Sequence, residues 1–481
     1  MAANSWQVER NGLDVIDAAE RKGTPRQLFW PWFGANVSVL GLSYGSFALG
    51  FGISFWQALI AGIAGIVGSF LLCGFISLAG KRGSAPTMVL SRAAFGVRGN
   101  RLPALVSWVL TVGWETVLAI LATLATATVF GQLGLGGGTA TKLVALFVVA
   151  ALVITGGVMG FDLIMRMQAV ITVVTAALTA CYIGFAAQRV DWQAVAAIPP
   201  GSAQNVLGAA VFLVTGFGLG WVNAAADYSR YLPRTSSGRA VVGWTVLGAS
   251  LAPVVLLVSG LLLAGSSPEL DDAVAADPIG ALAAVLPTWF LVPFVAVAVL
   301  GLVGGAVLDI YSSGLALLAA GVRVPRPVAA LADGVIMVAG TVAVVFFAGD
   351  FLAQFQGFLT TLGVPVAAWC GIVLADIALR RRDYAEADLH SRSGRYGDVR
   401  LLPVAVLVAA TALGWGLVTN TAAGWLGWQG YLLGPLGLED WASANPGVLV
   451  ALVLGFAATF AFARSAVRAQ EAEPSTVGVS G

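Results

Sequence analysis

The chain has 481 residues, of which 58% are hydrophobic and 10% are charged, and its formal net charge is +1. A soluble globular domain carries about 25% charged residues, so this composition excludes an ordinary soluble protein. The three cysteines lie within apolar runs and the only histidine lies in a polar stretch, so we expect no disulfide framework, no metal centre and no cofactor.

Twelve apolar runs are each long enough to cross a bilayer as a helix, which takes about 20 residues. They are too long and too continuously apolar for barrel strands. The first 29 residues are polar, carry Arg10, Arg21, Lys22 and Arg26 and have no early apolar core, and we expect no cleavable signal peptide there. The predicted spans are 30–53, 55–79, 103–131, 142–160, 167–187, 206–231, 240–264, 289–320, 328–348, 352–379, 401–419 and 447–466.

These spans predict an all-α integral membrane protein with four parts. Residues 1–29 form an N-terminal cytoplasmic segment, and residues 30–400 form a ten-helix core. Residues 401–466 form two accessory helices, and residues 467–481 form a disordered cytoplasmic tail.

The positive residues predict the orientation in the membrane. With the N-terminus in the cytoplasm, all of the 25 Lys and Arg except Lys142 and Arg189 fall on the cytoplasmic side. The outer loop at 265–288 holds acidic residues and neither Lys nor Arg. Because positive residues concentrate in cytoplasmic loops, both termini are predicted to be cytoplasmic. The protein itself is predicted to lie in the plasma membrane.

Glycines are dense in the first and sixth spans. Gly34, Gly41 and Gly45 lie in the first, and 216–220 reads GFGLG in the sixth. Glycine costs a helix interior about 1 kcal/mol relative to alanine, and paired glycine-rich spans are typical of discontinuous helices around a midplane site. Five spans per half then predict a five-plus-five inverted repeat. The alternative is that these glycines only permit close helix packing.

Two acidic residues lie inside otherwise apolar spans: Glu115 in the third and Asp309 in the eighth. A charged side chain at the bilayer centre costs roughly 2.5–3.5 kcal/mol on insertion scales. Such groups mark sites for a substrate, an ion or a proton, so they favour a transporter over a membrane anchor. Asp227 with Arg230 predicts a local ion pair or inner gate element, and Asp376 with Arg380, four residues apart, predicts an ion pair.

Five segments resemble, in the right order, the nucleobase–cation symporter family, in its purine–cytosine permease branch. They are FWPWFGANVSVLGLSYGSFALG, GKRGSAPTMVLSRAAFGVRGNRLPALVSWVLTVGWE, GWVNAAADYSRYLP, DIYSSGLALLAAGV and FLAQFQGFLTTLGVPVAAWCGIVLADIALRRRDY. The resemblance covers about residues 28–400. It implies twelve helices with a LeuT-like five-plus-five inverted repeat, in agreement with the spans and glycines.

The resemblance also implies a flat heterocyclic cargo held between aromatic rings. Trp114 matches the family's stacking tryptophan of the third span, and Phe217 and Trp221 are candidates for the ring opposite, with plain packing as their alternative. Stacking contributes about 1–3 kcal/mol per base but discriminates poorly. Selectivity therefore needs hydrogen-bonding groups, for which the candidates are Glu115, Asn223, Asp309 and Gln356.

The coupling cation is where this chain departs from the family. Sodium-coupled relatives carry hydroxyl side chains about one turn before an asparagine of the eighth span. Here those positions are Val303, Gly304 and Gly305, and Asp309 replaces the asparagine. Ala35 and Ser38 of the first span could offer carbonyls, and Ser312 a hydroxyl, but a hard cation prefers several oxygen ligands.

A buried carboxylate can carry a proton instead of a metal ion. We therefore expect proton coupling in preference to sodium, with Asp309 or Glu115 as the acceptor.

The leading hypothesis is a secondary active importer of a nucleobase, cytosine or a purine first. The same fold carrying a hydantoin, allantoin, uracil or a vitamin precursor is the second. A non-concentrative channel and a membrane enzyme are further alternatives, and we expect no enzyme because no Ser/His arrangement or phosphate loop stands out. The expected partners are a small heterocycle and membrane lipid but no nucleic acid, and the sequence predicts no oligomeric state.

Overall fold

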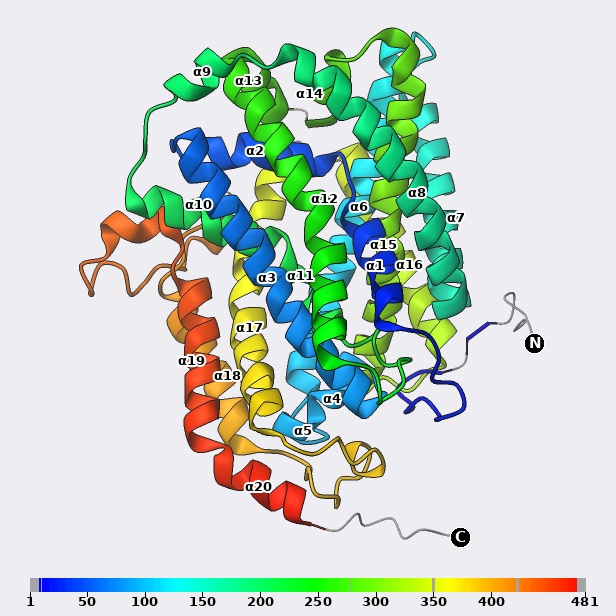
Figure 1. Cartoon of the computed structure of the whole chain (residues 1–481), viewed down its shortest axis with the longest axis vertical. Helices are drawn as coiled ribbons and strands as arrows, with labels where there is room; N and C mark the ends of the chain where they lie inside the picture. The colour runs from blue at the N-terminus through cyan, green and yellow to red at the C-terminus, as the bar shows by residue number, and fades with distance from the viewer. Residues whose placement is uncertain (1–7, 10, 277, 348–350, 421–423, 474–481) are drawn as a thin grey trace.

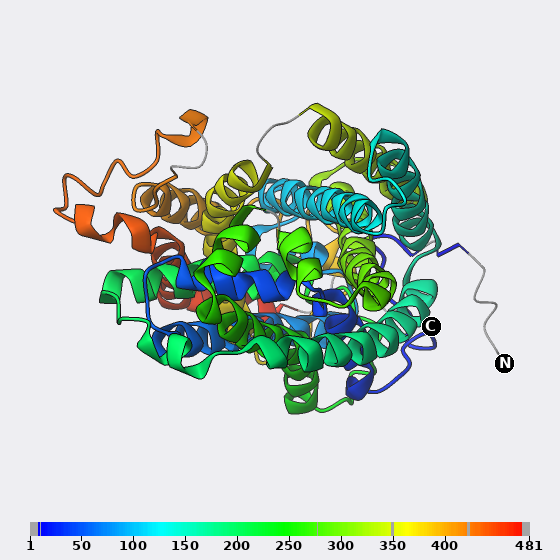
Figure 2. The same ribbon diagram turned by 90° about the horizontal axis from the view of Figure 1, so that it is seen from above.

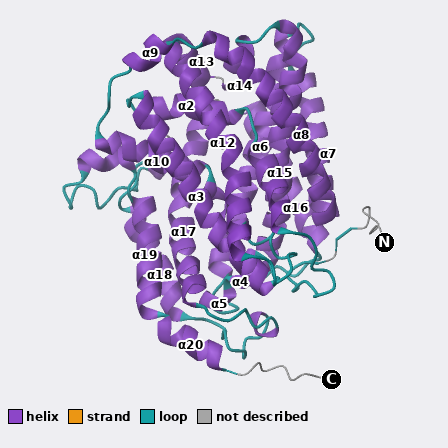
Figure 3. Ribbon diagram, in the orientation of Figure 1, coloured by secondary structure: helices purple, strands orange, loops and turns teal. Residues whose placement is uncertain are grey.

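The computed structural model describes residues 8–9, 11–276, 278–347, 351–420 and 424–473. Helices dominate, and no strand occurs within these ranges (Figure 3). In the first half the helices are α1 (Phe29–Asn36), α2 (Leu40–Leu49), α3 (Phe55–Gly83), α4 (Thr87–Leu90), α5 (Arg92–Phe95), α6 (Arg101–Gln132), α7 (Thr139–Met159), α8 (Phe161–Ala186), α9 (Trp192–Ala197), α10 (Ala203–Gly216) and α11 (Gly218–Trp221). In the second half they are α12 (Gly238–Ser266), α13 (Pro268–Ala276), α14 (Pro278–Ala284), α15 (Leu291–Ala320), α16 (Arg326–Phe347), α17 (Phe351–Leu379), α18 (Leu401–Trp415), α19 (Gly447–Phe462) and α20 (Arg464–Ala472).

Nine helices in the described ranges are long and apolar enough to cross a membrane, and they coincide with predicted spans two to ten. The first predicted span corresponds to α1 followed by α2, and the last two correspond to α18 and α19, all of which are shorter. The prediction of an all-helical bundle with many spans is confirmed.

Most of the long helices run along one axis, so the bundle has two ends (Figure 1). We call one of them the basic end, defined by residues 8–9, 11–28, 84–100, 225–237 and 380–400. Arg21 pairs with Glu386 at 2.7 Å, and the N–H of Arg381 donates to Glu471 at 2.8 Å. The N-terminal segment and α20 therefore lie at the same end. The opposite end, with α9, α13 and α14, is called the far end.

The prediction of a disordered tail from residue 467 is wrong for the first residues of that segment, which form part of α20. α20 bends by 57° from α19, and its Val467 and Gln470 are buried. Gln470 accepts a hydrogen bond from Arg380 at 2.6 Å, so this helix is anchored to the bundle. The remaining residues lie outside the described ranges.

α15 forms the centre of the bundle, because it packs against α6, α7, α8, α16 and α1. Nearly all of its residues from Gly301 to Ala319 are buried. Viewed along the bundle, α18 and α19 lie at one side, and α7 and α16 lie at the other (Figure 2). The C-terminal helices are thus peripheral, and the buried polar residues of α15 face other helices.

Candidate functional site

The first and sixth spans are both interrupted, as their glycines predicted. α1 ends at Asn36 and α2 begins at Leu40. In the sixth span Phe217 separates α10 from α11, with φ −118° and ψ −106°. Helix ends leave backbone N–H and C=O groups without intrahelical partners, so each interruption offers polar backbone in the interior of the bundle.

A cavity of about 60 Å³ lies between the two interruptions. Six of the residues singled out from the sequence line it: Ala35, Ser38, Trp114, Phe217, Trp221 and Asp309. Asn36, Leu40, Gly41, Tyr44, Leu118, Gly216 and Gly301 complete the wall. The structure therefore brings together the aromatic residues and one of the two intramembrane acids that the sequence pointed to.

Aromatic rings surround this cavity on several sides. The centroids of Tyr44 and Phe217 are 4.5 Å apart, and Trp221 meets Trp32 edge to face at 5.8 Å. A Cβ atom on Gly220 would lie 3.0 Å from Nε1 of Trp114. The glycine therefore lets the indole of α6 approach the sixth span closely. Aromatic rings in the cavity wall offer flat faces on which a flat ring can stack.

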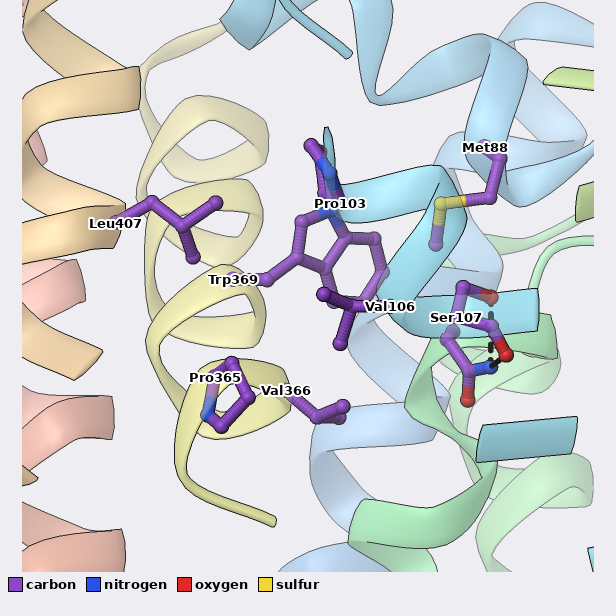
Figure 4. Close-up of a pocket in the computed structure, with 9 residues that line it drawn as sticks. Met88, Pro103, Val106, Ser107, Pro365, Val366, Trp369 and Leu407 are labelled. Atoms are coloured by element: carbon purple, nitrogen blue, oxygen red, sulfur yellow. Dashed lines mark hydrogen bonds between the residues drawn. The ribbon is translucent and has the colours of Figure 1, made fainter. Parts of the chain in front are cut away.

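Three other predicted residues point elsewhere, and the side chain of Gln356 is outside what the structure describes. Asn223 donates to the hydroxyl of Ser107 at 2.8 Å. Asn223 and Ser107 line a second, smaller cavity of about 10 Å³ together with Trp369 and Pro365 of α17 (Figure 4). Ser312 lies 3.1 Å from the hydroxyl of Tyr228.

Glu115 is also outside the cavity wall, because it turns toward α15 and α16. Its Oε2 lies 3.4 Å from the hydroxyl of Ser313. That hydroxyl donates to Oδ2 of Asp333 at 2.7 Å, and Nε1 of Trp108 donates to Oδ1 of the same carboxylate at 2.9 Å. Glu115 and Asp333 are both fully buried.

Asp333 was missed by the sequence analysis. It lies in the apolar helix Arg326–Phe347, whose mean hydropathy is 2.2. An acid inside a hydrophobic span is the same signal that singled out Glu115 and Asp309, so it could have been found.

The interruption of the first span packs tightly against α15. A Cβ on Gly301 would lie 2.4 Å from the carbonyl oxygen of Val37, and one on Gly304 would lie 2.6 Å from that of Gly34. No room remains for hydroxyl side chains on this face of α15. Gln168 of α8 donates its amide N–H to the carbonyl of Gly304 at 2.7 Å. The residues present therefore fit a sodium ion poorly.

The basic end is closed by a polar cluster around Arg230, which is fully buried. Its guanidinium lies 3.2 Å from Glu9 and donates to the hydroxyl of Tyr311 at 2.7 Å. Tyr231 also donates to Glu9. Arg326 donates to the backbone carbonyl of Glu9 at 3.2 Å. The N-terminal segment therefore ties together the sixth span, α15 and α16.

The predicted Asp376–Arg380 ion pair is confirmed, whereas for Asp227 and Arg230 the ion-pair alternative is wrong and the gate-element alternative stays a prediction. Arg380 and Asp376 pair at 2.6 Å. Asp227 instead accepts hydrogen bonds from the N–H and hydroxyl of Thr87 at 2.7 and 2.8 Å. These neutral donors satisfy the Asp227 carboxylate, which leaves Arg230 to pair with Glu9, a contact too distant in sequence to be predicted.

A larger cavity of about 710 Å³ opens at the far end. Phe212 and Thr215 of α10, Asp271 of α13 and the amides of Asn420 and Asn445 line part of it. Thr215 immediately precedes Gly216, which lines the smaller aromatic cavity. The far-end cavity therefore leads toward the aromatic cavity. Cavities of about 640 and 340 Å³ also lie at the basic end, but none of their lining residues adjoins a residue of the aromatic cavity's wall in the sequence.

A bundle of membrane-spanning helices with two interrupted spans around a buried cavity is the architecture of a secondary transporter. Residues 15–434 match the family described as permeases for cytosine/purines, uracil, thiamine and allantoin. The chain belongs to this family, the nucleobase–cation symporters, and it is a multi-pass membrane transporter, not an enzyme.

Two kinds of relatives agree with this assignment. The chain is 26% identical over 418 residues to the "Putative purine-cytosine permease YxlA" of Bacillus subtilis, which covers 85% of this chain and 87% of the relative.

Among solved structures, the nucleobase-cation-symport-1 family transporter Mhp1, in a closed conformation with bromovinylhydantoin bound, has a TM-score of 0.71 at 18% identity. The structural match covers 96% of this chain and 99% of Mhp1. A Na⁺-coupled sialic acid symporter gives a TM-score of 0.61 at 9% identity, covering 95% and 92%. At these identities the likeness shows the LeuT-like fold alone.

Proposed function

We propose that this protein imports a nucleobase, cytosine or a purine first, by alternating access and together with a proton. The observation that carries the proposal is the cavity between the two interruptions, lined by Trp114, Phe217, Trp221 and Asp309. The rings provide flat apolar faces, and the carboxyl of Asp309 provides a hydrogen-bonding group for a ring nitrogen or an exocyclic amine.

A proton suits the interior better than sodium for two reasons. The face of α15 beside the first interruption is glycine, and an amide N–H of Gln168 already satisfies the carbonyl of Gly304. Two buried acids, Asp309 and Glu115, have an oxygen without a hydrogen-bond partner among the described residues. A carboxylic acid can hold a proton there, whereas sodium needs several oxygen ligands.

The distribution of positive residues supports an orientation with the basic end in the cytoplasm. Both terminal segments then lie in the cytoplasm, and the far-end cavity faces the outside of the plasma membrane. A positive charge moving inward releases about 2.3 kcal/mol per 100 mV. This could sustain accumulation of roughly 50-fold, at about 1.4 kcal/mol per tenfold.

A second candidate cargo is a related heterocycle such as a hydantoin, allantoin, uracil or a vitamin precursor. Mhp1, which has the same fold, is described with bromovinylhydantoin bound. Stacking accepts any flat ring of suitable size, so the aromatic wall admits this class as well.

The test is uptake of labelled heterocycles into proteoliposomes under imposed gradients. Accumulation of cytosine or a purine above equilibrium, driven by a proton gradient without sodium, is the expected result. Accumulation that requires sodium and ignores a protonophore at clamped potential would rule out proton coupling. Uptake that never exceeds equilibrium would indicate a channel. Preference for hydantoin or allantoin would select the second cargo class.

A further inference from the structure

The cluster of Glu115, Ser313 and Asp333 lies one helical turn from the proposed cargo cavity. Asp309 lines that cavity, and Ser313 follows it by four residues on α15, on the same face of the helix. The cluster joins α6, α15 and α16, and none of its three members lines the cavity. Contact with the cargo therefore does not explain why these buried polar residues are present.

The hydrogen bonds of Ser313 determine where its single proton points. Its oxygen has three possible acceptors: Oδ2 of Asp333 at 2.7 Å, the carbonyl of Ile310 at 3.2 Å and Oε2 of Glu115 at 3.4 Å. The shortest contact is with Asp333. Both oxygens of Asp333 then accept hydrogen bonds, one from Ser313 and one from Trp108, which is the pattern of an ionised carboxylate.

Glu115 is in the opposite situation. Its Oε1 has no hydrogen-bond partner within the described part of the chain, and the residue is fully buried. When Ser313 donates to Asp333, Oε2 of Glu115 faces a lone pair of the serine. An attractive contact then requires a hydrogen on Glu115, so the geometry corresponds to a neutral carboxylic acid donating to Ser313.

Among the described residues, no Lys or Arg pairs with Glu115. The main helices packed against α6 carry seven ionisable residues: Lys142, Asp309, Tyr311, Arg326, Asp333, Cys370 and Asp376. Arg326 donates to the carbonyls of Gly157 and Val158, Asp376 pairs with Arg380, and Tyr311 bonds to Glu9. Lys142 lies in the first turn of α7, away from the basic end. The groups that face Glu115 are thus two further acids, which disfavour a second negative charge.

We propose that Glu115 holds the transported proton and that Ser313 relays it to Asp333. This inference rests on the proposed proton coupling and specifies its carrier. The proton on Oε2 of Glu115 moves to the oxygen of Ser313 while the proton of Ser313 moves to Oδ2 of Asp333. Glu115 becomes the carboxylate, Asp333 becomes the acid, and the serine is unchanged. Asp333 lies two turns from the start of α16 at the basic end, which gives the proton a route toward that side.

The first test is transport in proteoliposomes with three variants: Glu115→Gln, Asp333→Asn and Ser313→Ala. We expect each to lose accumulation driven by a proton gradient while retaining exchange of labelled for unlabelled cargo, which needs no net proton movement. Retained exchange also shows that a variant is folded. Thr116→Val is the matched control, because Thr116 adjoins Glu115 but its hydroxyl donates to the carbonyl of Val112 in its own helix.

Gradient-driven accumulation at the wild-type level in Glu115→Gln or Asp333→Asn would overturn this inference while leaving proton coupling intact. A wild-type protein whose accumulation ignores the proton gradient would overturn both. The two failures are therefore distinguishable in one set of measurements.

The second test reads the protonation state of the purified protein and needs no transport. Infrared spectroscopy of the wild type at neutral pH should show a carboxylic acid C=O band with a component that disappears in Glu115→Gln. The component should remain in Thr116→Val, and it should shift in Ser313→Ala because the acid loses its acceptor. A spectrum that Glu115→Gln leaves unchanged would show that Glu115 is ionised and would contradict the proposal.

Discussion

The two ends of the bundle are closed by different chemistry. At the basic end, Arg230 is fully buried and joins Glu9 to Tyr311. At the far end, a cavity of about 710 Å³ approaches the aromatic cavity, and Tyr44 stands between them with its ring against Phe217 and Phe212. The aromatic cavity is therefore closed by a charged cluster toward the basic end and by aromatic ring contacts toward the far end.

This difference indicates how firmly each end is held. Removing one partner of a buried ion pair costs about 3–5 kcal/mol, whereas a pair of aromatic rings contributes about 0.5–1.5 kcal/mol beyond its buried area. The basic end should therefore be the harder one to open. In the proposed orientation the outer side admits cargo readily, and the cytoplasmic side opens only when something weakens the Arg230 cluster.

The largest effect is expected from Arg230→Ala. This variant leaves Glu9 without its cation and should shift the protein toward a state open at the basic end, by about 3–5 kcal/mol. The measurement is thiol labelling of a cysteine placed at the buried position Ser312, in a background without Cys73, Cys181 and Cys370.

Arg234→Ala is the control for that experiment, because Arg234 pairs with the partly exposed Glu386. Such surface pairs contribute about 0–1 kcal/mol, so labelling should hardly change. Equal labelling in the two variants would show that the charged cluster does not hold the basic end closed.

Trp114→Ala should have the next largest effect. Losing one stacking face removes about 1–3 kcal/mol, so the dissociation constant of the cargo should rise roughly 5- to 150-fold. Binding is measured by the shift in thermal stability with increasing heterocycle concentration. Trp56→Ala, on the exposed face of α3 with 64% of the residue accessible, should bind normally. If Trp114→Ala binds as tightly as Trp56→Ala, the stacking hypothesis fails.

Tyr44→Ala sharpens the comparison at the far end. Removing this ring takes away its contacts with Phe217 and Phe212 and should speed release of cargo toward the far-end cavity about 2- to 10-fold. The measurement is the dissociation rate of labelled cargo from the purified protein. Accessibility of the basic end should stay unchanged. A slower release, or an opening at the basic end, would show that Tyr44 does not separate the two cavities.

The smallest effect is expected from Asp398→Asn, in the loop after α17, and it concerns the stability of the fold. The hydrogen bond from Arg98 lowers the pKa of Asp398 below its usual value. The pair therefore stabilises the folded state above the ordinary pKa of aspartate, about 3.9, and this contribution is lost as the pH falls through the lowered folded-state pKa. Asp398→Asn should unfold at a slightly lower temperature than the wild type at pH 7. The gap should close in acid, and a gap that widens there would contradict this assignment.

Sequence reasoning reached the family, the spans and six of the thirteen residues of the cavity wall. Trp114, Phe217, Trp221 and Asp309 could be found because motif position and unusual placement in apolar runs single them out. Tyr44 and Asn36 could not, because an aromatic or amide residue in a span has many packing roles. Only the bend of the first span turns these two toward the sixth.

The errors have a common physical cause. Glu115 was predicted as a hydrogen-bonding group for the cargo, but it does not line the cavity that Trp114 lines, because consecutive residues of a helix point about 100° apart. One faces the cavity and the other faces α15 and α16. Likewise Arg230 was assigned to its near neighbour Asp227, whereas its partner is Glu9, 221 residues away along the chain.

By itself, the sequence determined that the chain crosses a membrane many times, that two spans break, and that Glu115 and Asp309 are buried at a cost. These follow from local hydropathy, glycine density and the energy of charge in lipid. Only the tertiary structure decided which acid touches the cavity and which joins Asp333 through Ser313, because the rotation of each helix is set by its packing against the others.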